Sequence, residues 1–265
     1  MARSSNALLF GRRPVQTFVS MITEGAGQNA AEGVAKIWLS ESFPGKFKAD
    51  LLKALPAAPL QEVPRRQLDQ RFPGIHHQGV VLEFRPGYDP ARASTGDTDW
   101  RDLVREHPGL VVLLDRIQDP HNLGSIIRSA EALGAALVIR TGQGAPLGDV
   151  AHRVSSGASL RLPVFEHRNL RQVVQELKSA GYWICSAAGE AQPESRALVH
   201  DHTDLSGLPP TNDIALVIGN EGEGVKALTL SESDYVISIA MRGSTPSLNA
   251  GVAAALLIDR LVSRF

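Results

Sequence analysis

Amide, guanidinium, carboxylate and hydroxyl groups gather in three loops of this 265-residue chain, each directly after a strand-like apolar run. The loops span residues 115–128, 218–225 and 239–249. Side chains of these kinds can orient a ligand and stabilise charge that develops in a reaction. In open parallel sheets, ligands bind beyond the carboxyl ends of the strands. We therefore interpret the three loops as candidate parts of a binding site.

The first loop contains Asp119 and Pro120, a typical N-cap followed by proline at the first helical position. A well-capped helix is the alternative interpretation, but it does not explain Asn122 and Arg128 together. Arg128 falls beside the apolar stripe of the helix, where a charge needs a partner. Six residues place Asn122 and Arg128 about 120° apart on a helix, so both reach one site only if Asn122 precedes the helix.

The second loop, Gly219-Asn-Glu-Gly-Glu-Gly224, follows a strand and precedes a short helix. Its glycine spacing matches neither the dinucleotide-binding nor the P-loop pattern. Glu221 and Glu223 would repel phosphate, so a neutral or cationic ligand fits better, and a tight turn with solvated glutamates is the alternative. In the third loop, Ser247 is a good N-cap for a last helix predicted over 248–262, whose small residues allow close approach of another backbone or a flat ligand.

Apolar runs that alternate with helical spacing predict a parallel α/β sheet in the second part of the chain. Breaker-rich residues 85–98 indicate a linker, so we expect a small domain at 1–86, a linker at 87–106 and a second domain at 107–265. In the small domain we expect a helix that opens at 10–15 and strands at 34–40 and 79–84. In the second domain the predicted strands are 109–114, 136–139, 182–186, 214–218 and 235–239, and the predicted helices are 123–133, 150–155, 170–180 and 248–262.

The composition is that of an ordinary globular chain, with 43% hydrophobic residues, 21% charged residues and a net charge of −1. The single cysteine, Cys185, excludes an internal disulfide and a cysteine-based zinc site, and we predict no metal site. No apolar run is long enough to cross a bilayer, and we expect no membrane partner. A cytoplasmic location is the default expectation.

Taken together, the three loops resemble the SpoU family of RNA 2′-O-ribose methyltransferases, within the SPOUT class. Its first motif appears as Asn122-Leu-Gly-Ser-Ile-Ile-Arg128 and its second as Gly219-Asn-Glu-Gly-Glu-Gly224. Its third appears as Ile239-Ala-Met-Arg-Gly-Ser-Thr-Pro-Ser-Leu-Asn-Ala-Gly-Val-Ala253, with Ala240 in place of the usual proline. Residues 154–158 are similar to the family's Ser-x-Gly-Ala segment. In the small domain, residues 10–15 and 77–80 look like signatures of the ribosomal-protein-like RNA-binding domain of two-domain members.

The resemblance implies an α/β fold: a C-terminal parallel-sheet domain with a deep trefoil knot, and a small N-terminal α/β substrate-binding domain. It implies S-adenosylmethionine as the cofactor, bound by Gly219, Gly222, Ile239, Met241 and Leu248. It also implies Arg128 as the catalytic group, with Asn122, Glu221, Ser247 and Asn249 orienting Arg128, the ribose and the cofactor. A guanidinium is effectively always charged, so a cation that stabilises the developing alkoxide is physically easier than a general base.

Family members are homodimers that pack through the knot region, and RNA contacts can come from both subunits. We expect Arg12 and Arg13 to hold the RNA backbone, and His77 and Gln78 either to do the same or to shape a turn. The leading hypothesis is methylation of a guanosine ribose in 23S rRNA. The alternatives are a tRNA guanosine 2′-O-methyltransferase, a non-catalytic RNA-binding ribosome-assembly factor, and a generic nucleotide-binding α/β protein, which the missing glycine spacings disfavour.

Overall fold

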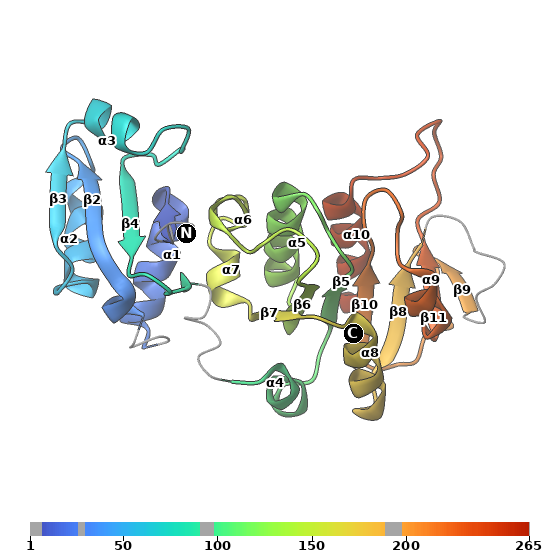
Figure 1. The fold of residues 1–265 in the computed structure, drawn as a ribbon. Coiled ribbons are helices and arrows are strands. Elements are labelled where there is room, and N and C mark those ends of the chain that lie inside the picture. The colour runs from blue at the N-terminus through green and yellow to red at the C-terminus, as the bar shows by residue number, and fades with distance from the viewer. Residues whose placement is uncertain (1–6, 26–29, 91–97, 189–197, 265) are drawn as a thin grey trace. The chain divides into compact units, whose positions relative to one another are not determined.

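A computed structural model describes residues 7–25, 30–90, 98–188 and 198–264 of the chain (Figure 1). These residues divide into two compact units. Unit 1 lies within 1–97 and 147–161, and unit 2 within 98–146 and 162–265. Part of the predicted linker, 91–97, lies outside the described residues, and its remainder includes helix α4 (Trp100–Glu106). The domain limits 1–86, 87–106 and 107–265 stay a prediction.

Unit 1 contains a four-stranded sheet in the order β1-β4-β2-β3, with only β2 and β3 parallel. Alternate residues of β2 point to opposite faces, since side chains of a strand alternate. Ile37 and Leu39 pack with helices α1 and α2, whereas Trp38 packs on the other face with Phe72, which follows α3. The elements are β1 (Leu8–Phe10), α1 (Arg12–Thr23), a 3₁₀ turn (Ala31–Gly33), β2 (Val34–Ser40), α2 (Gly45–Ala54), β3 (Leu60–Val63), α3 (Arg65–Arg71) and β4 (Val80–Phe84).

Unit 1 also contains two helices from a later part of the sequence, α6 (Asp149–Val154) and α7 (Ala158–Arg161). A side chain at Gly157 would place its Cβ 2.5 Å from Thr17 Oγ1 of α1, so glycine is required there. His152 is buried, and its Nδ1 lies 2.8 Å from Ser159 Oγ. Burial lowers the pKa of His152, which favours the neutral imidazole. The Ser-x-Gly-Ala segment therefore packs within unit 1.

Unit 2 is a seven-stranded parallel sheet in the order β7-β6-β5-β10-β8-β11-β9. Helices α5 and α10 pack against each other, and the core on the other face joins α4, α8 and α9 to the strands. Both faces are thus covered, which explains the continuous apolar runs of the central strands. The elements besides α4 are β5 (Val111–Leu114), α5 (Pro120–Ala132), β6 (Leu137–Thr141), β7 (Val164–His167), α8 (Leu170–Ser179), β8 (Trp183–Ala187), β9 (Leu198–Asp201), β10 (Ile214–Ile218), α9 (Ala227–Ser231), β11 (Tyr235–Ser238) and α10 (Ala250–Val262).

The parallel α/β sheet is confirmed, and the five strands predicted for the second part of the chain are present as β5, β6, β8, β10 and β11. Asp119 caps α5 and Pro120 is its first residue, as predicted. The predicted start of the last helix was wrong, because α10 begins at Ala250 and its N-cap is Asn249 rather than Ser247.

Cys185 is buried in β8, as expected, and burial raises its thiol pKa to about 12. Among the described residues, no group of three or more His, Cys, Asp or Glu side chains could hold a metal ion. No helix within the described ranges is long and apolar enough to cross a membrane.

Candidate active site

A cavity of about 1120 Å³ lies in unit 2 beyond the carboxyl ends of β8, β10 and β11. This is the edge of a parallel sheet at which ligands bind. Its walls come from Ala187 and Ala188, the loop 218–225, residues 237–241 and 243–248, and the start of α10. All five residues predicted to bind the cofactor line this one cavity: Gly219, Gly222, Ile239, Met241 and Leu248.

The loop after β10 is closed on itself at its base. The backbone N–H groups of Asn220 and Gly224 each donate to the other residue's carbonyl, at 3.1 and 2.9 Å. A Cβ atom on Gly219 would lie 2.1 Å from Gly224 C and 2.2 Å from Val225 N, so no side chain fits at this position. Gly224 has a φ of +69°, which glycine adopts without steric cost. The glycines therefore allow the loop backbone to form a thin wall of the cavity.

Three side chains, from α5, the loop after β10 and the N-cap of α10, form a continuous hydrogen-bonded chain at this edge of the sheet. Asn122 Nδ2 donates to Glu221 Oε1 at 2.7 Å, and Asn249 Nδ2 donates to Asn122 Oδ1 at 2.7 Å. Asn249 Oδ1 accepts the backbone N–H groups of Gly251 and Val252, which caps α10. The Glu221 carboxylate can only accept hydrogen bonds, so Asn122 must turn its Nδ2 toward Glu221 and its Oδ1 toward Asn249. This in turn fixes the orientation of the Asn249 amide.

Glu221 is held in its charged form by these contacts. Burial alone would raise its pKa, but hydrogen bonds from Asn122 and from the backbone of Gln118 and Asp119 outweigh burial and lower it. Because a low pKa makes a weak base, the carboxylate is suited to fixing Asn122 rather than to removing a proton.

Comparison with known proteins decides which family combines this cavity with these three loops. The model of the SpoU rRNA Methylase family matches residues 109–259, more than half of the chain. The chain belongs to this family. A second family model, RNA 2′-O ribose methyltransferase substrate binding, matches residues 8–89.

Several named relatives of the SpoU family are similar to this chain over most of its length. The 23S rRNA (guanosine-2′-O-)-methyltransferase RlmB of Pseudomonas putida is 32% identical over 241 residues, which cover 89% of this chain and 90% of the relative. RlmB of Escherichia coli strain K12 is 33% identical over 240 residues, covering 89% and 92%. The crystal structure of the SpoU methyltransferase AviRb from Streptomyces viridochromogenes in complex with AdoMet superposes with a TM-score of 0.73 at 26% identity, covering 98% and 91%.

The SpoU arginine, Arg128, does not join the Asn122–Glu221 pair within one chain. Asn122 lies inside α5 and not before it, so the condition for both side chains to reach one site is not met. The expectation that Arg128 needs an internal partner was wrong, because its side chain is exposed and forms no hydrogen bond or ion pair with the described part of the chain. Ser247 is exposed and lines the cavity.

Sequence reasoning missed a second set of contacts that holds the same SpoU loop. Arg116 Nη1 donates to Glu223 Oε2 at 2.6 Å and Arg116 Nε donates to Asp115 Oδ1 at 3.1 Å. The other oxygen of Asp115 accepts the backbone N–H of Lys226 at 3.1 Å, and Asn220 Nδ2 donates to the Arg116 carbonyl at 3.0 Å. The bond to Glu223, followed by Asp115, raises the pKa of Arg116. The adjacent charged residues Asp115 and Arg116, directly after a buried strand, were the signal that could have revealed these contacts.

In unit 1, the four predicted RNA-binding residues differ in exposure. Arg12 and Arg13 are exposed, and Arg12 Cζ lies 5.4 Å from the centroid of the Phe43 ring. Gln78 Oε1 accepts the backbone N–H of Arg12 at 2.9 Å. His77 is buried, with Nε2 at 2.9 Å from Asp69 Oδ1 and Nδ1 accepting the Gly79 N–H. These contacts favour the turn-shaping alternative for His77.

Proposed function

We propose that this chain is an S-adenosylmethionine-dependent methyltransferase that methylates a ribose 2′-hydroxyl in RNA, namely a guanosine of 23S rRNA. One observation carries the proposal: the predicted cofactor residues line a single cavity, and Glu221 joins that cavity to the Asn122–Asn249 chain. The names of the RlmB relatives, which are aligned over about nine tenths of both chains, support the choice of substrate.

The residues around the cavity fit S-adenosylmethionine. Gly219 and Gly222 line the cavity with backbone alone, while Ile239, Met241 and Leu248 offer apolar surface for an adenine ring. Glu221 and Glu223 suit a ligand that carries positive charge. When bound, the cofactor supplies an electrophilic methyl group.

The residues of the chain must then position and activate a poor nucleophile, the ribose hydroxyl. Arg128 carries a permanent positive charge, and we assign it to the target phosphate and to the alkoxide that develops as the hydroxyl passes its proton to water. Asn122 and Asn249 are held in one orientation by Glu221 and by the cap of α10, so they present fixed polar groups to the ribose. Ser247 adds a hydroxyl at the cavity wall.

We further propose a homodimer in which Arg128 serves the site of the partner subunit. Asn122 and Arg128 diverge by about 120° on one helix, so a single chain does not bring them together. Leu248, Val252 and Leu256 leave 37%, 50% and 41% of their surface exposed, an apolar stripe at the start of α10 that a second copy would cover. The resemblance also implies that the C-terminal segment forms a trefoil knot around this region.

For the remaining parts, we propose that residues 1–86 bind the RNA, with Arg12 and Arg13 on its backbone, and that 107–265 form the methyltransferase domain. We assign the linker to 87–106, of which α4 packs into the core of unit 2, whereas residues 147–161 of the proposed methyltransferase domain belong to unit 1. The match of residues 8–89 to a substrate-binding family supports this division. A ribosomal RNA substrate also implies a cytoplasmic location.

The test is transfer of labelled methyl groups from S-adenosylmethionine to 23S rRNA and tRNA transcripts. We expect label only in 23S rRNA, on a ribose. Label in tRNA alone would support the tRNA alternative, and no transfer to either RNA or to ribosomal particles would support the non-catalytic one. Arg128→Ala should abolish transfer and leave cofactor binding, measured by calorimetry, unchanged. Lost cofactor affinity would reject the role of Arg128.

Mixing two inactive variants tests the shared site. If Arg128 acts across the dimer, mixed Arg128→Ala and Asn122→Ala subunits should recover about a quarter of the wild-type activity, since half of the dimers then hold one intact site. No recovery with exchanged subunits would place Arg128 in its own chain's site.

A further inference from the structure

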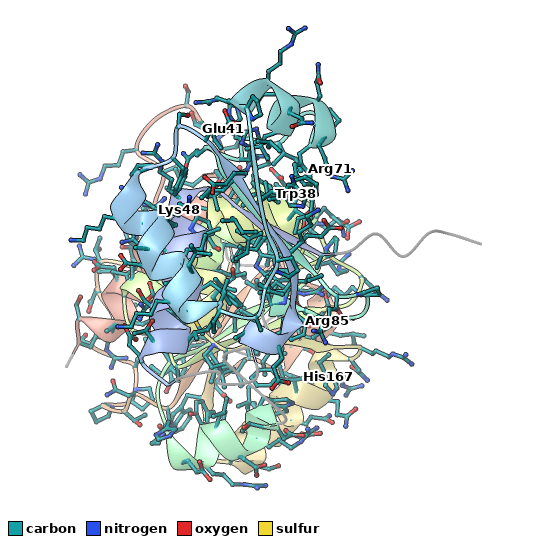
Figure 2. The ribbon with its side chains drawn as sticks, turned by 90° about the vertical axis from the view of Figure 1, so that its left-hand side faces the viewer. Trp38, Glu41, Lys48, Arg71, Arg85 and His167 are labelled. Carbon is teal, nitrogen blue, oxygen red and sulfur yellow. The ribbon has the colours of Figure 1, made fainter. Side chains whose placement is uncertain are left out.

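The outer face of the unit 1 sheet carries two cations on one aromatic ring. Lys36 Nζ lies 4.1 Å and Arg71 Cζ 4.6 Å from the ring centroid of Trp38. Lys36 and Trp38 are alternate residues of β2 and so lie on the same face, whereas Arg71 ends α3. Figure 2 shows Trp38 and Arg71 on one side of the unit and Lys48 of α2 on the other.

The Trp38 ring is fixed rather than free to turn. Its Nε1 donates to Glu83 Oε2 at 3.0 Å, and its ring packs edge-to-face with Phe72, with centroids 5.8 Å apart. Trp38 remains half-buried, and α3 packs on the part of the face formed by Phe10, Val63 and Val81. The fixed ring therefore holds two long, flexible side chains in one place by cation–π attraction.

The charges of this cluster are unbalanced. Lys36 and Arg71 form no hydrogen bond or ion pair with any other described residue, although both lie within 5 Å of the same ring centroid. The neighbouring carboxylate, Glu83, is the cross-strand partner of Lys36 and accepts the indole N–H, and it offsets only one of the two positive charges. Two cations beside a single carboxylate leave an excess of positive charge, which a bound polyanion would neutralise.

We propose that Lys36, Trp38 and Arg71 form a second RNA contact surface, in which the two cations bind phosphates of the substrate RNA backbone. This inference rests on the proposed function, because it takes the substrate to be RNA. The surface lies on the sheet face opposite to α1, whose first residues Arg12 and Arg13 were expected from the sequence. RNA that contacts both would follow unit 1 around its sheet.

The test compares two charge-neutralised variants of the full chain. Lys36→Gln/Arg71→Gln removes the proposed contacts, and Lys46→Gln/Lys53→Gln removes two exposed charges from α2, on the opposite face. Affinity for a 23S rRNA transcript is measured without cofactor at several salt concentrations. Two lost single-strand phosphate contacts should reduce the slope of log K against log salt by about 1.4 and weaken binding roughly tenfold at 0.15 M. The control should match the wild type.

A third variant tests the contribution of the Trp38 ring to RNA binding. Trp38→Leu keeps both cations but removes their platform, and it should weaken RNA binding while thermal unfolding confirms that the chain folds. Wild-type affinity and slope in Lys36→Gln/Arg71→Gln, or an equal loss in the α2 control, would overturn the proposal. Cofactor calorimetry and methyl transfer are measured separately. If the wild-type protein methylates RNA and the Lys36→Gln/Arg71→Gln variant binds RNA normally, the proposed contact surface is refuted but the enzymatic function is not. A protein that binds RNA here but transfers no methyl group refutes only the enzymatic function.

Discussion

Replacing Gly219 by alanine should disrupt the cofactor cavity with a change of one carbon atom. The new Cβ would lie 2.1 Å from Gly224 C, 2.2 Å from Val225 N and 2.5 Å from Gly224 O. All three are backbone atoms, so no side-chain rotation relieves the overlap. Ordinary van der Waals contact begins near 3.5 Å, so the two strands of the loop must separate by more than about 1 Å.

That separation breaks the two backbone hydrogen bonds that join Asn220 and Gly224. At about 1 kcal/mol for each bond, holding the variant loop in its binding shape costs roughly 2 kcal/mol, which corresponds to about a 30-fold weaker cofactor affinity. The control is Gly45→Ala at the start of α2, a residue that does not line the cavity and whose Cβ would meet no atom within 4 Å.

Calorimetric titration with S-adenosylmethionine distinguishes the two variants. We expect Gly219→Ala to lose most of its affinity and Gly45→Ala to stay within about threefold of the wild type, equivalent to less than 1 kcal/mol. Thermal unfolding should show both variants folded. Equal affinities in the two variants would show that the loop backbone does not form the wall of the cofactor site.

Substitutions at two further positions test contacts around the cavity, and a labelling experiment tests the burial of Cys185. Asn249→Asp keeps the cap of α10 but cannot donate to Asn122, so it should lose transfer activity at an unchanged Tm, whereas Asn249→Ala should also lose about 1 kcal/mol of stability and a few degrees in Tm. An equal Tm loss in both would contradict the cap. Arg116→Lys keeps the charge but not the fork that joins Asp115 to Glu223, and it should raise the Kd for the cofactor, so wild-type affinity would refute the clamp. Cys185, whose pKa is about 12, should react with a thiol reagent at pH 8 only after unfolding, and rapid labelling of the native chain would show that it is accessible.

Buried central strands were predictable because both faces of the unit 2 sheet are covered. The run Val111–Leu114 is fully buried, and an uninterrupted apolar run is the direct consequence. Strands β7 and β9 were missed, and they form the two edges of the sheet. In β7 no residue of Val164–His167 is fully buried, so the apolar signal fades there.

The start of α10 was misjudged for a local reason. Ser247 and Asn249 are both good N-cap residues, and local sequence does not choose between them. The structure selects Asn249, whose amide also reaches Asn122, a residue 127 positions away. N-cap propensity does not decide which of the two residues caps α10, and the one that does also forms a tertiary hydrogen bond.

The residues of the site were predictable as types, but their partners were not. Asn122 and Glu221 are 99 residues apart and meet because β5 and β10 are neighbours in the sheet. That strand order follows from long-range packing rather than from any local pattern. The Arg116–Glu223 ion pair spans the same two strands, which is why it escaped sequence reasoning.

Mapping of ribose methylation in RNA from a strain that lacks this chain is the decisive experiment for the proposed activity. We expect one 2′-O-methylated guanosine to disappear from 23S rRNA, tRNA to stay unchanged, and the wild-type chain, but not Arg128→Ala, to restore the methyl group. An unchanged methylation pattern in both RNA pools would contradict the proposed activity.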